Sequence, residues 1–169
     1  MDDNRRAALF ALDIAMQTER DGRAFYLRAA ESTQDAQGHA LFNRLADDEL
    51  GHLAMLDERR KALAEQGEWL PFGETPHASA PRTPIFAKRL GEGELNVHTS
   101  DLSALRVAYL LEKDAVEFYT RAAKHTDDAE GRKMYLALVE MEESHRDALE
   151  TEYRLLSEQF KSMMGFSPF

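Results

Sequence analysis

Apolar residues recur along this chain three and four residues apart, which is the spacing of one face of an α-helix. Four segments carry the pattern, at residues 5–31, 35–66, 101–125 and 128–161. In the first segment, for example, Leu12, Met16 and Tyr26 share the apolar face. Two short polar stretches, STQDAQG and HTDDAEG, separate the first segment from the second and the third from the fourth. The pattern therefore predicts four helices arranged as two antiparallel hairpins.

Both polar stretches hold residue types that favour helix N-caps. Threonine and aspartate occur in each, and their short side chains accept hydrogen bonds from the free N–H groups of a first helical turn. In the second stretch Asp127 lies three residues before Glu130, which is the spacing of a capping box. We therefore predict that the second and fourth helices begin within these stretches.

Residues 67–100 differ from the rest of the chain. They contain all but one of the five prolines together with clustered glycines, so a long helix is not expected there. A connection of this length fits a bundle in which the third helix begins at the end opposite to where the second finishes. We predict that this crossover joins a hairpin at 5–66 to a hairpin at 101–161 within a single domain, residues 1–169.

The two hairpins repeat each other with a constant offset of 93 residues and no gap. Matching pairs are Ala15/Ala108, Glu19/Glu112, Asp21/Asp114, Tyr26/Tyr119, Gly38/Gly131, Leu45/Leu138, Glu49/Glu142, His52/His145 and Leu56/Leu149. Two copies of one hairpin would pack about a pseudo-twofold axis. The repeat by itself indicates only a shared architecture, and its value lies in which residues recur.

Two repeated pairs place an acid and an imidazole on apolar helix faces. Glu49 and His52 are three residues apart on the second predicted helix, as are Glu142 and His145 on the fourth. Side chains at this spacing lie on the same face of a helix. Both pairs are therefore expected to face the interior of the bundle.

The first and third predicted helices contribute one acid each. Glu19 lies on the apolar stripe seven residues before Tyr26, and Glu112 stands in the same relation to Tyr119. Each of the four helices therefore directs a carboxylate at the bundle axis. One Glu from each of two helices and Glu-x-x-His from each of the other two is the ligand set of di-iron and di-manganese carboxylate bundles.

Electrostatics favours a metal-loaded form of this cluster. Four carboxylates in an apolar interior repel one another and lose hydration, so without cations they should take up protons, admit water or loosen the bundle. Two divalent cations, roughly 3.5–4 Å apart, would cancel the four charges. Oxygen-rich coordination with one nitrogen per ion suits iron or manganese, and zinc can compete. The predicted roles are bridging for Glu49 and Glu142, terminal for His52 and His145, and outer carboxylate for Glu19 and Glu112.

Each element of this set also has a purely structural interpretation. A single E-x-x-H motif is weak evidence in a Glu-rich helical protein, and a lone Glu on an apolar stripe often reaches its solvent edge. Tyr26 and Tyr119 would serve equally as core aromatics. The metal site is favoured because both motifs and both lone glutamates fall at equivalent places of one repeat.

The composition limits the function further. The formal net charge of −10 disfavours a nucleic-acid surface, which needs a basic stripe. The absence of cysteine excludes disulfides, iron–sulfur clusters and Cys-ligated zinc or iron in this chain. No apolar run approaches the roughly 20 residues of a membrane span. We therefore expect a cytoplasmic protein that binds neither nucleic acid nor membrane.

The sequence resembles the rubrerythrin-like branch of the ferritin-like superfamily. The likeness is carried by four motifs that span both hairpins, Glu19-x6-Tyr26, Glu49-x-x-His52, Glu112-x6-Tyr119 and Glu142-x-x-His145. It implies a ferritin-like, all-α four-helix bundle with a non-haem di-iron centre that reacts, when reduced, with hydrogen peroxide or dioxygen. It also implies that the two tyrosines donate hydrogen bonds to the ligating carboxylates.

Two features depart from that family. Rubrerythrins usually carry a Cys-ligated rubredoxin domain that supplies electrons, whereas this chain has no cysteine, so a separate electron-donor protein is expected. Rubrerythrins also tend to have a further glutamate one turn after the third-helix ligand, and here that residue is Ala115.

The leading functional hypothesis is an oxidoreductase whose di-iron site reduces peroxide to water or dioxygen to peroxide. Two others stay open: iron handling, in which ferrous iron is oxidised and passed on or stored, and a scaffold whose metal is structural or absent and which binds a partner protein.

Trp69 and Phe72 are expected to hold the crossover on the bundle. The apolar tail MMGFSPF is expected to dock or to contact another subunit. We expect a homodimer, with the crossover either folding back or exchanging hairpins.

Overall fold

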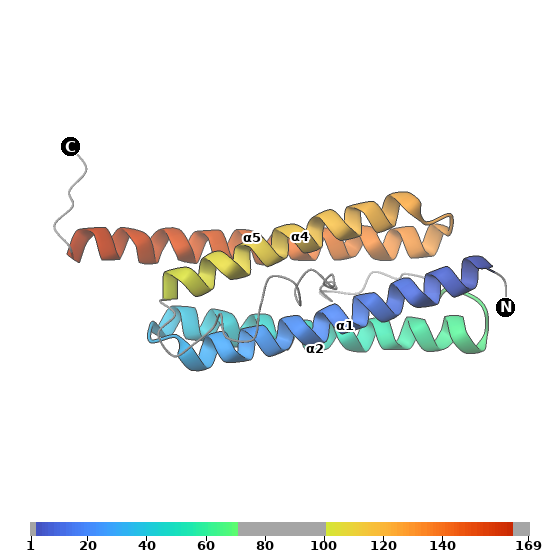
Figure 1. Cartoon of the computed structure of the whole chain (residues 1–169), viewed down its shortest axis with the longest axis horizontal. Helices are drawn as coiled ribbons and strands as arrows, with labels where there is room; N and C mark the ends of the chain where they lie inside the picture. The colour runs from blue at the N-terminus through green and yellow to red at the C-terminus, as the bar shows by residue number, and fades with distance from the viewer. Residues whose placement is uncertain (1–2, 71–100, 164–169) are drawn as a thin grey trace.

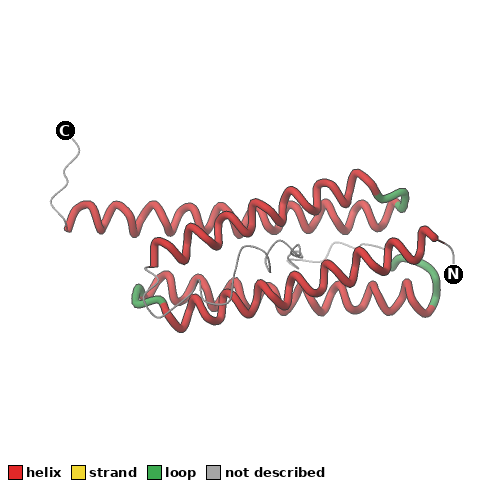
Figure 2. Tube along the Cα trace, viewed as in Figure 1, coloured by secondary structure: helices red, strands yellow, loops and turns green. Residues whose placement is uncertain are grey.

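Four long helices make up the described part of the computed structural model, residues 3–70 and 101–163 (Figure 1). Helix α1 spans Asp3–Ser32, α2 spans Ala36–Glu65, α4 spans Asp101–His125 and α5 spans Ala129–Met163. These residues contain no strand, as Figure 2 shows. The prediction of an all-α four-helix bundle is confirmed, and every helix begins and ends within two residues of its predicted limits.

The chain enters the second hairpin at the end opposite to where it leaves the first. In Figure 1, α2 finishes near the N-terminus, whereas α4 begins near the turn that joins α1 to α2. The Asp101 carboxylate fixes this junction, because it accepts hydrogen bonds from the backbone N–H groups of Gln34 at 3.3 Å and Asp35 at 3.1 Å. The predicted crossover from residue 71 onward, Phe72 included, lies outside the described residues, as do tail residues 164–169.

Aspartates cap α2 and α5 at equivalent places of the repeat. Asp35 and Asp128 each accept a hydrogen bond from the backbone N–H three residues later, at 2.7 Å and 2.9 Å. The prediction of a capping box between Asp127 and Glu130 is wrong. The carboxylate of Asp128 is the one that reaches the first turn of α5, which leaves Glu130 one residue too near the cap to complete a capping box.

The C-terminal end of α2 is closed by a glycine and by an arginine from α1. Gly67 follows the C-cap Gln66 with a φ of +81°, in the left-handed region that favours glycine. Arg5 donates hydrogen bonds to the carbonyl oxygens of Leu63 at 2.8 Å and Ala64 at 2.6 Å. Carbonyls of the last helical turn have no partner within their own helix, so these bonds both satisfy them and fasten α1 to α2.

A layer of buried polar residues divides the apolar core into two clusters. The cluster nearer the α1–α2 turn includes Phe25, Phe42, Leu45, Leu105 and Leu149. The cluster nearer the α4–α5 turn includes Leu12, Met16, Leu56, Met134 and Leu138. Every helix contributes to both clusters. The buried acids of all four helices, and the buried histidines of α2 and α5, fall between the clusters. The polar layer is therefore shielded from water along the bundle axis.

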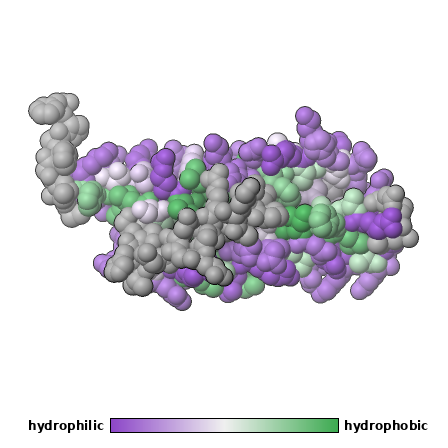
Figure 3. Space-filling model, viewed as in Figure 1, coloured by the Kyte–Doolittle hydropathy of each residue, from purple (hydrophilic) through white to green (hydrophobic). Residues whose placement is uncertain are grey.

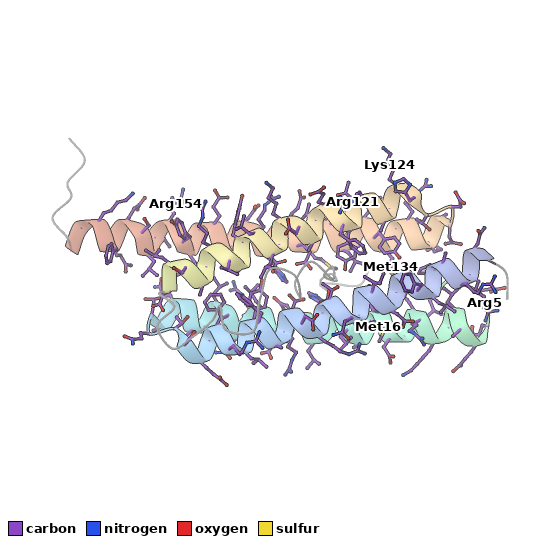
Figure 4. All side chains as sticks on the ribbon, viewed as in Figure 1. Arg5, Met16, Arg121, Lys124, Met134 and Arg154 are labelled. Atoms are coloured by element: carbon purple, nitrogen blue, oxygen red, sulfur yellow. The ribbon has the colours of Figure 1, made fainter. Side chains whose placement is uncertain are left out.

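The outer surface follows the amphipathic pattern of the helices. Figure 3 shows hydrophilic residues over the outer faces of both hairpins and hydrophobic residues gathered along the line where the hairpins meet. Met16 and Met134 point into the interior, whereas Arg121, Lys124 and Arg154 point outward (Figure 4). Within the described ranges, none of the helices combines the length and the apolar composition that a membrane span requires.

Gly51, in the middle of α2, is a site where alanine is expected to stabilise the protein. A Cβ atom built there meets nothing within 4 Å, and glycine inside a helix is roughly 0.5–1 kcal/mol less favourable than alanine. We expect Gly51→Ala to raise the free energy of unfolding by about that amount, measured by urea denaturation followed by circular dichroism. Gly131→Ala is the control, because its Cβ would lie 3.1 Å from Cζ2 of Trp69. Equal gains for both variants would contradict this explanation.

Candidate metal centre

The structure brings all six predicted site residues together in the polar layer between the two apolar clusters. The contributions are Glu19 from α1, Glu49 and His52 from α2, Glu112 from α4, and Glu142 and His145 from α5. His145 is 6% exposed and the other five are fully buried. Charged side chains are almost never fully buried unless they are paired or bind a metal.

The first half of the site joins α1 to α2. Nδ1 of His52 lies 2.8 Å from Oε2 of Glu19 and 2.7 Å from Oε2 of Glu49. The i, i+3 spacing on α2 sets the second contact, and the packing of the hairpin sets the first. One imidazole nitrogen therefore faces two carboxylates from different helices.

The second half repeats this pattern on α4 and α5 with longer distances. Nδ1 of His145 lies 3.1 Å from Oε2 of Glu142 and 3.9 Å from Oε1 of Glu112. The two imidazole rings stack, with His52 and His145 centroids 5.6 Å apart and an interplanar angle of 20°. The two halves thus meet face to face across the hairpin interface.

The donor atoms form two groups that share members. One group is Glu19, Glu49, His52 and Glu142, and the other is Glu49, Glu112, Glu142 and His145. Within each group, one potential ligand atom from every residue lies within 4.8 Å of the others. Glu49 and Glu142 belong to both groups. This overlap is the arrangement expected if two cations are bridged by two carboxylates.

The two tyrosines of the repeat differ in their hydrogen bonding. The Tyr26 hydroxyl donates to Oε1 of Glu112, across the interface between the hairpins. The equivalent bond would join Tyr119 to Glu19, but the Tyr119 hydroxyl has no hydrogen-bond partner among the described residues. Burial raises the pKa of Tyr119 well above its ordinary value, and the charges of nearby glutamates act in the same direction. Tyr119 is therefore a neutral phenol at physiological pH.

Burial and mutual repulsion shift the titration of the cluster. Burial raises the pKa of Glu142 well above its ordinary value, and the charges of Glu112 and Glu49 raise it further. Burial lowers the pKa of His52 despite the opposing charge of Glu49. Burial also acts to lower the pKa of His145, but contacts with carboxylates outweigh this and raise the pKa well above its ordinary value. The buried carboxylates of the cluster are therefore favoured when they are protonated or when a positive charge lies beside them.

Sequence reasoning missed Asp48, which contacts the outer nitrogen of one histidine. Oδ2 of Asp48 lies 3.4 Å from Nε2 of His145, and this interaction lowers the pKa of Asp48. A carboxylate at this position fixes the imidazole so that Nδ1 faces the cluster. The repeat could not reveal it, because the residue equivalent to Asp48 is Met141. Accordingly, Nε2 of His52 has no hydrogen-bond partner in the described part of the chain.

The donor set fits metal ions. Oε1 of Glu142 is buried and has no hydrogen-bond partner among the described residues, which is costly for a carboxylate. Carboxylate oxygens and neutral imidazole nitrogens are ligands that iron, manganese and zinc accept. Four carboxylates also match the charge of two divalent cations. The residues present could therefore hold such ions without further groups.

Comparisons with known proteins bear on the family and the fold of the chain. The family model for rubrerythrin matches residues 11–153. A solved structure of a hypothetical protein from Pyrococcus furiosus superimposes with a TM-score of 0.65 at 24% sequence identity, covering 90% of this chain and 91% of that one. At this identity the likeness shows a shared fold. Among curated proteins, none matches the sequence significantly.

Proposed function

The chain belongs to the rubrerythrin family, and from this premise we propose that it is a non-haem di-iron oxidoreductase whose reduced site reacts with hydrogen peroxide or dioxygen. The observation that carries the proposal is the pair of overlapping carboxylate–histidine groups buried between the hairpins. Peroxide is the substrate we favour, with dioxygen as the alternative oxidant.

Six side chains would hold the two ions. Glu49 and Glu142, which belong to both groups, would bridge them. His52 and His145 would each supply one terminal nitrogen, and Glu19 and Glu112 the outer carboxylates. Iron is the proposed metal, and manganese or zinc would accept the same donors.

Two ferrous ions would supply the two electrons that reduce hydrogen peroxide to water or dioxygen to hydrogen peroxide. The side chains of the protein itself would strengthen the electrostatic interactions, orient the ligands and bind protons. Apolar clusters on both sides of the polar layer exclude water, which strengthens each electrostatic interaction inside it. Tyr26 holds the Glu112 carboxylate and Asp48 holds the His145 ring. Glu142 retains a proton readily, so metal binding is expected to release one.

Electrons must then be returned to the site from elsewhere. The chain contains no cysteine, so it cannot itself ligate a rubredoxin-type iron. We propose a separate electron-donor protein as the partner that restores the reduced state, and a homodimer as the functional assembly.

The proposed function is tested by comparing the two oxidants. Protein loaded anaerobically with ferrous iron is mixed rapidly with hydrogen peroxide or with dioxygen, and iron oxidation is followed by absorbance. We expect a much faster reaction with peroxide and two irons still bound after gel filtration. Iron that leaves the site or mineralises in large assemblies would instead support iron handling. A protein that binds no iron tightly would support the scaffold hypothesis.

Tyr26→Phe is expected to weaken ferrous binding by about 10- to 100-fold, because outer groups that orient a ligand typically contribute that much to metal affinity. The variant removes the hydrogen bond to Glu112 and leaves the ring in place. Anaerobic titration calorimetry measures the affinity. Tyr119→Phe is the matched comparison, since its hydroxyl has no hydrogen-bond partner among the described residues, and a smaller loss is expected. Equal losses in the two variants would show that the Glu112 bond has no such role.

A further inference from the structure

A row of oxidisable aromatic side chains leads from the polar layer toward one end of the bundle. The rings of Tyr119 and Tyr135 stack with their centroids 6.1 Å apart and an interplanar angle of 14°. Both are buried, at 0% and 3% exposure, and both belong to the same apolar cluster as Trp69. Tyrosine and tryptophan are the side chains that lose a single electron most readily after cysteine, which this chain lacks.

Trp69 continues this row to the surface. Its indole lies against α5 at Gly131, where a Cβ atom would be 3.1 Å from Cζ2 of Trp69. Gly131 is one helical turn before Tyr135, so the two rings occupy neighbouring turns of one face of α5. Trp69 and Tyr135 also line the same surface cavity of about 530 Å³, together with Arg5 and His125. The row therefore ends in contact with solvent.

The other half of the repeat lacks this row. Phe42 is the residue equivalent to Tyr135, and its ring stacks on Tyr26 with centroids 6.0 Å apart. The residue equivalent to Trp69 is Ser162. Because phenylalanine fills the equivalent core position at nearly the same ring separation, packing alone does not require the hydroxyl of Tyr135. An oxidisable ring at this position calls for another reason.

The distance between Trp69 and the buried site is a reason for an oxidisable ring at Tyr135. Glu142 is 11 residues beyond Gly131 on α5, which corresponds to about 16 Å of helix. Electron transfer slows exponentially with distance, so two intermediate rings convert one slow step into shorter, faster ones. Tyr119 lies at the site end of this path, where the nearby charges of Glu19 and Glu142 affect its hydroxyl.

We propose that Trp69, Tyr135 and Tyr119 form a one-electron relay between the surface cavity and the carboxylate–histidine site, and this inference rests on the proposed function. When excess hydrogen peroxide leaves the site with one oxidising equivalent more than two ferric ions would hold, Tyr119 donates one electron to the site and is re-reduced by Tyr135, which is in turn re-reduced by Trp69. The net change is one-electron reduction of the site and one-electron oxidation of the Trp69 indole, whose N–H proton passes to water in the cavity. A one-electron reductant, either the donor protein or a small molecule of the ascorbate class, then restores Trp69 as it regains a proton.

The connection between the rings is tested without any reaction at the metal site. Azide radicals generated by pulse radiolysis oxidise the indole of Trp69, the one tryptophan of the chain. We expect the oxidising equivalent to equilibrate between the rings, so that part of the indolyl-radical absorbance is replaced by tyrosyl-radical absorbance at a rate independent of protein concentration. Tyr135→Phe should abolish this transfer and leave the fold intact, because Phe42 shows that the repeat accepts phenylalanine there.

Tyr153→Phe is the matched control, because Tyr153 lies on the same helix but packs against the other apolar cluster. It should leave the transfer rate unchanged. Transfer that survives Tyr135→Phe, or an indolyl radical that decays only by collisions between molecules, would overturn the relay.

A second measurement connects the relay to the site. Ferrous-loaded protein is mixed with excess hydrogen peroxide without reductant, and radicals are trapped by rapid freezing for electron paramagnetic resonance. We expect an indolyl radical in the wild type, its loss in Tyr135→Phe and in Trp69→Phe, and oxidation of Trp69 detectable by mass spectrometry. Iron oxidation without any radical on these residues would overturn the relay and leave the proposed function standing. Iron that does not oxidise at all would overturn the proposed function, while the radiolysis result still decides whether the rings are connected.

Discussion

Replacing both Glu49 and Glu142 with alanine is expected to abolish tight ferrous binding, whereas the wild type should saturate at two irons per chain. These two carboxylates belong to both candidate ligand groups, so their removal leaves each group with a single carboxylate and a single imidazole. Two ligands do not make a stable site for a divalent ion of this class. Anaerobic titration with ferrous iron, followed by equilibrium dialysis and metal analysis, measures the stoichiometry.

A matched control for this variant lies on the same two helices. Glu58 of α2 and Glu150 of α5 are exposed glutamates, and their joint replacement by alanine changes the net charge equally. That control should still bind two irons. Retention of two tight sites by the Glu49 and Glu142 variant would contradict the bridging assignment, and loss of binding by the control would show that bulk charge, not the buried cluster, attracts the metal.

The helices and the meeting of the six site residues could be predicted because the repeat removes ambiguity from short motifs. A single E-x-x-H on a helix is compatible with a surface position, but its recurrence at a constant offset ties Glu49 to Glu142 and His52 to His145. Apolar periodicity then places all four on inner faces, which the structure confirms. Their role as metal ligands stays a prediction.

Features that break the repeat could not be predicted from it. Asp48 has a methionine as its counterpart, so its contact with His145 depends on how the hairpins pack. The exchange of Phe42 for Tyr135 reads as a conservative core substitution until the stacked rings are seen next to Trp69. Sequence symmetry thus indicates the shared chemistry of the two halves, whereas tertiary packing is needed to see how the halves differ.

Glu142→Gln is expected to stabilise the metal-free protein while removing its stabilisation by metal. The folded pKa of Glu142 lies well above its ordinary value of about 4.5, because of burial and the charges of Glu112 and Glu49. The stability that the Glu142 carboxyl contributes is therefore fully present below its pKa in the unfolded state. It is lost as pH rises through its pKa in the folded state. A glutamine carries no charge to bury, so the variant should unfold with a free energy about 1–3 kcal/mol higher at pH 8. Urea denaturation of the metal-free proteins measures this difference.

The pH dependence separates Glu142 from the histidines. His145 has a raised pKa, so its stability contribution also falls as pH rises above about 6.5. His52 has a lowered pKa, and its contribution is constant above that pH. The metal-free wild type should therefore lose stability as pH rises above about 4.5 for Glu142 and above about 6.5 for His145, by up to about 1.4 kcal/mol per pH unit for each proton involved.

The variant should show a shallower slope over the same range, since only the contribution of His145 remains. Saturating ferrous iron under anaerobic conditions should reverse the order of stability, because a ligand bound only to the folded state stabilises the wild type by about 4 kcal/mol at a thousand times its dissociation constant. Glu143→Gln, on the neighbouring and partly exposed residue, should follow the wild type in both states. If Glu142→Gln destabilised the metal-free protein, or gained as much from iron as the wild type, the buried carboxylates would be held by contacts within the chain and not by the ions that we propose.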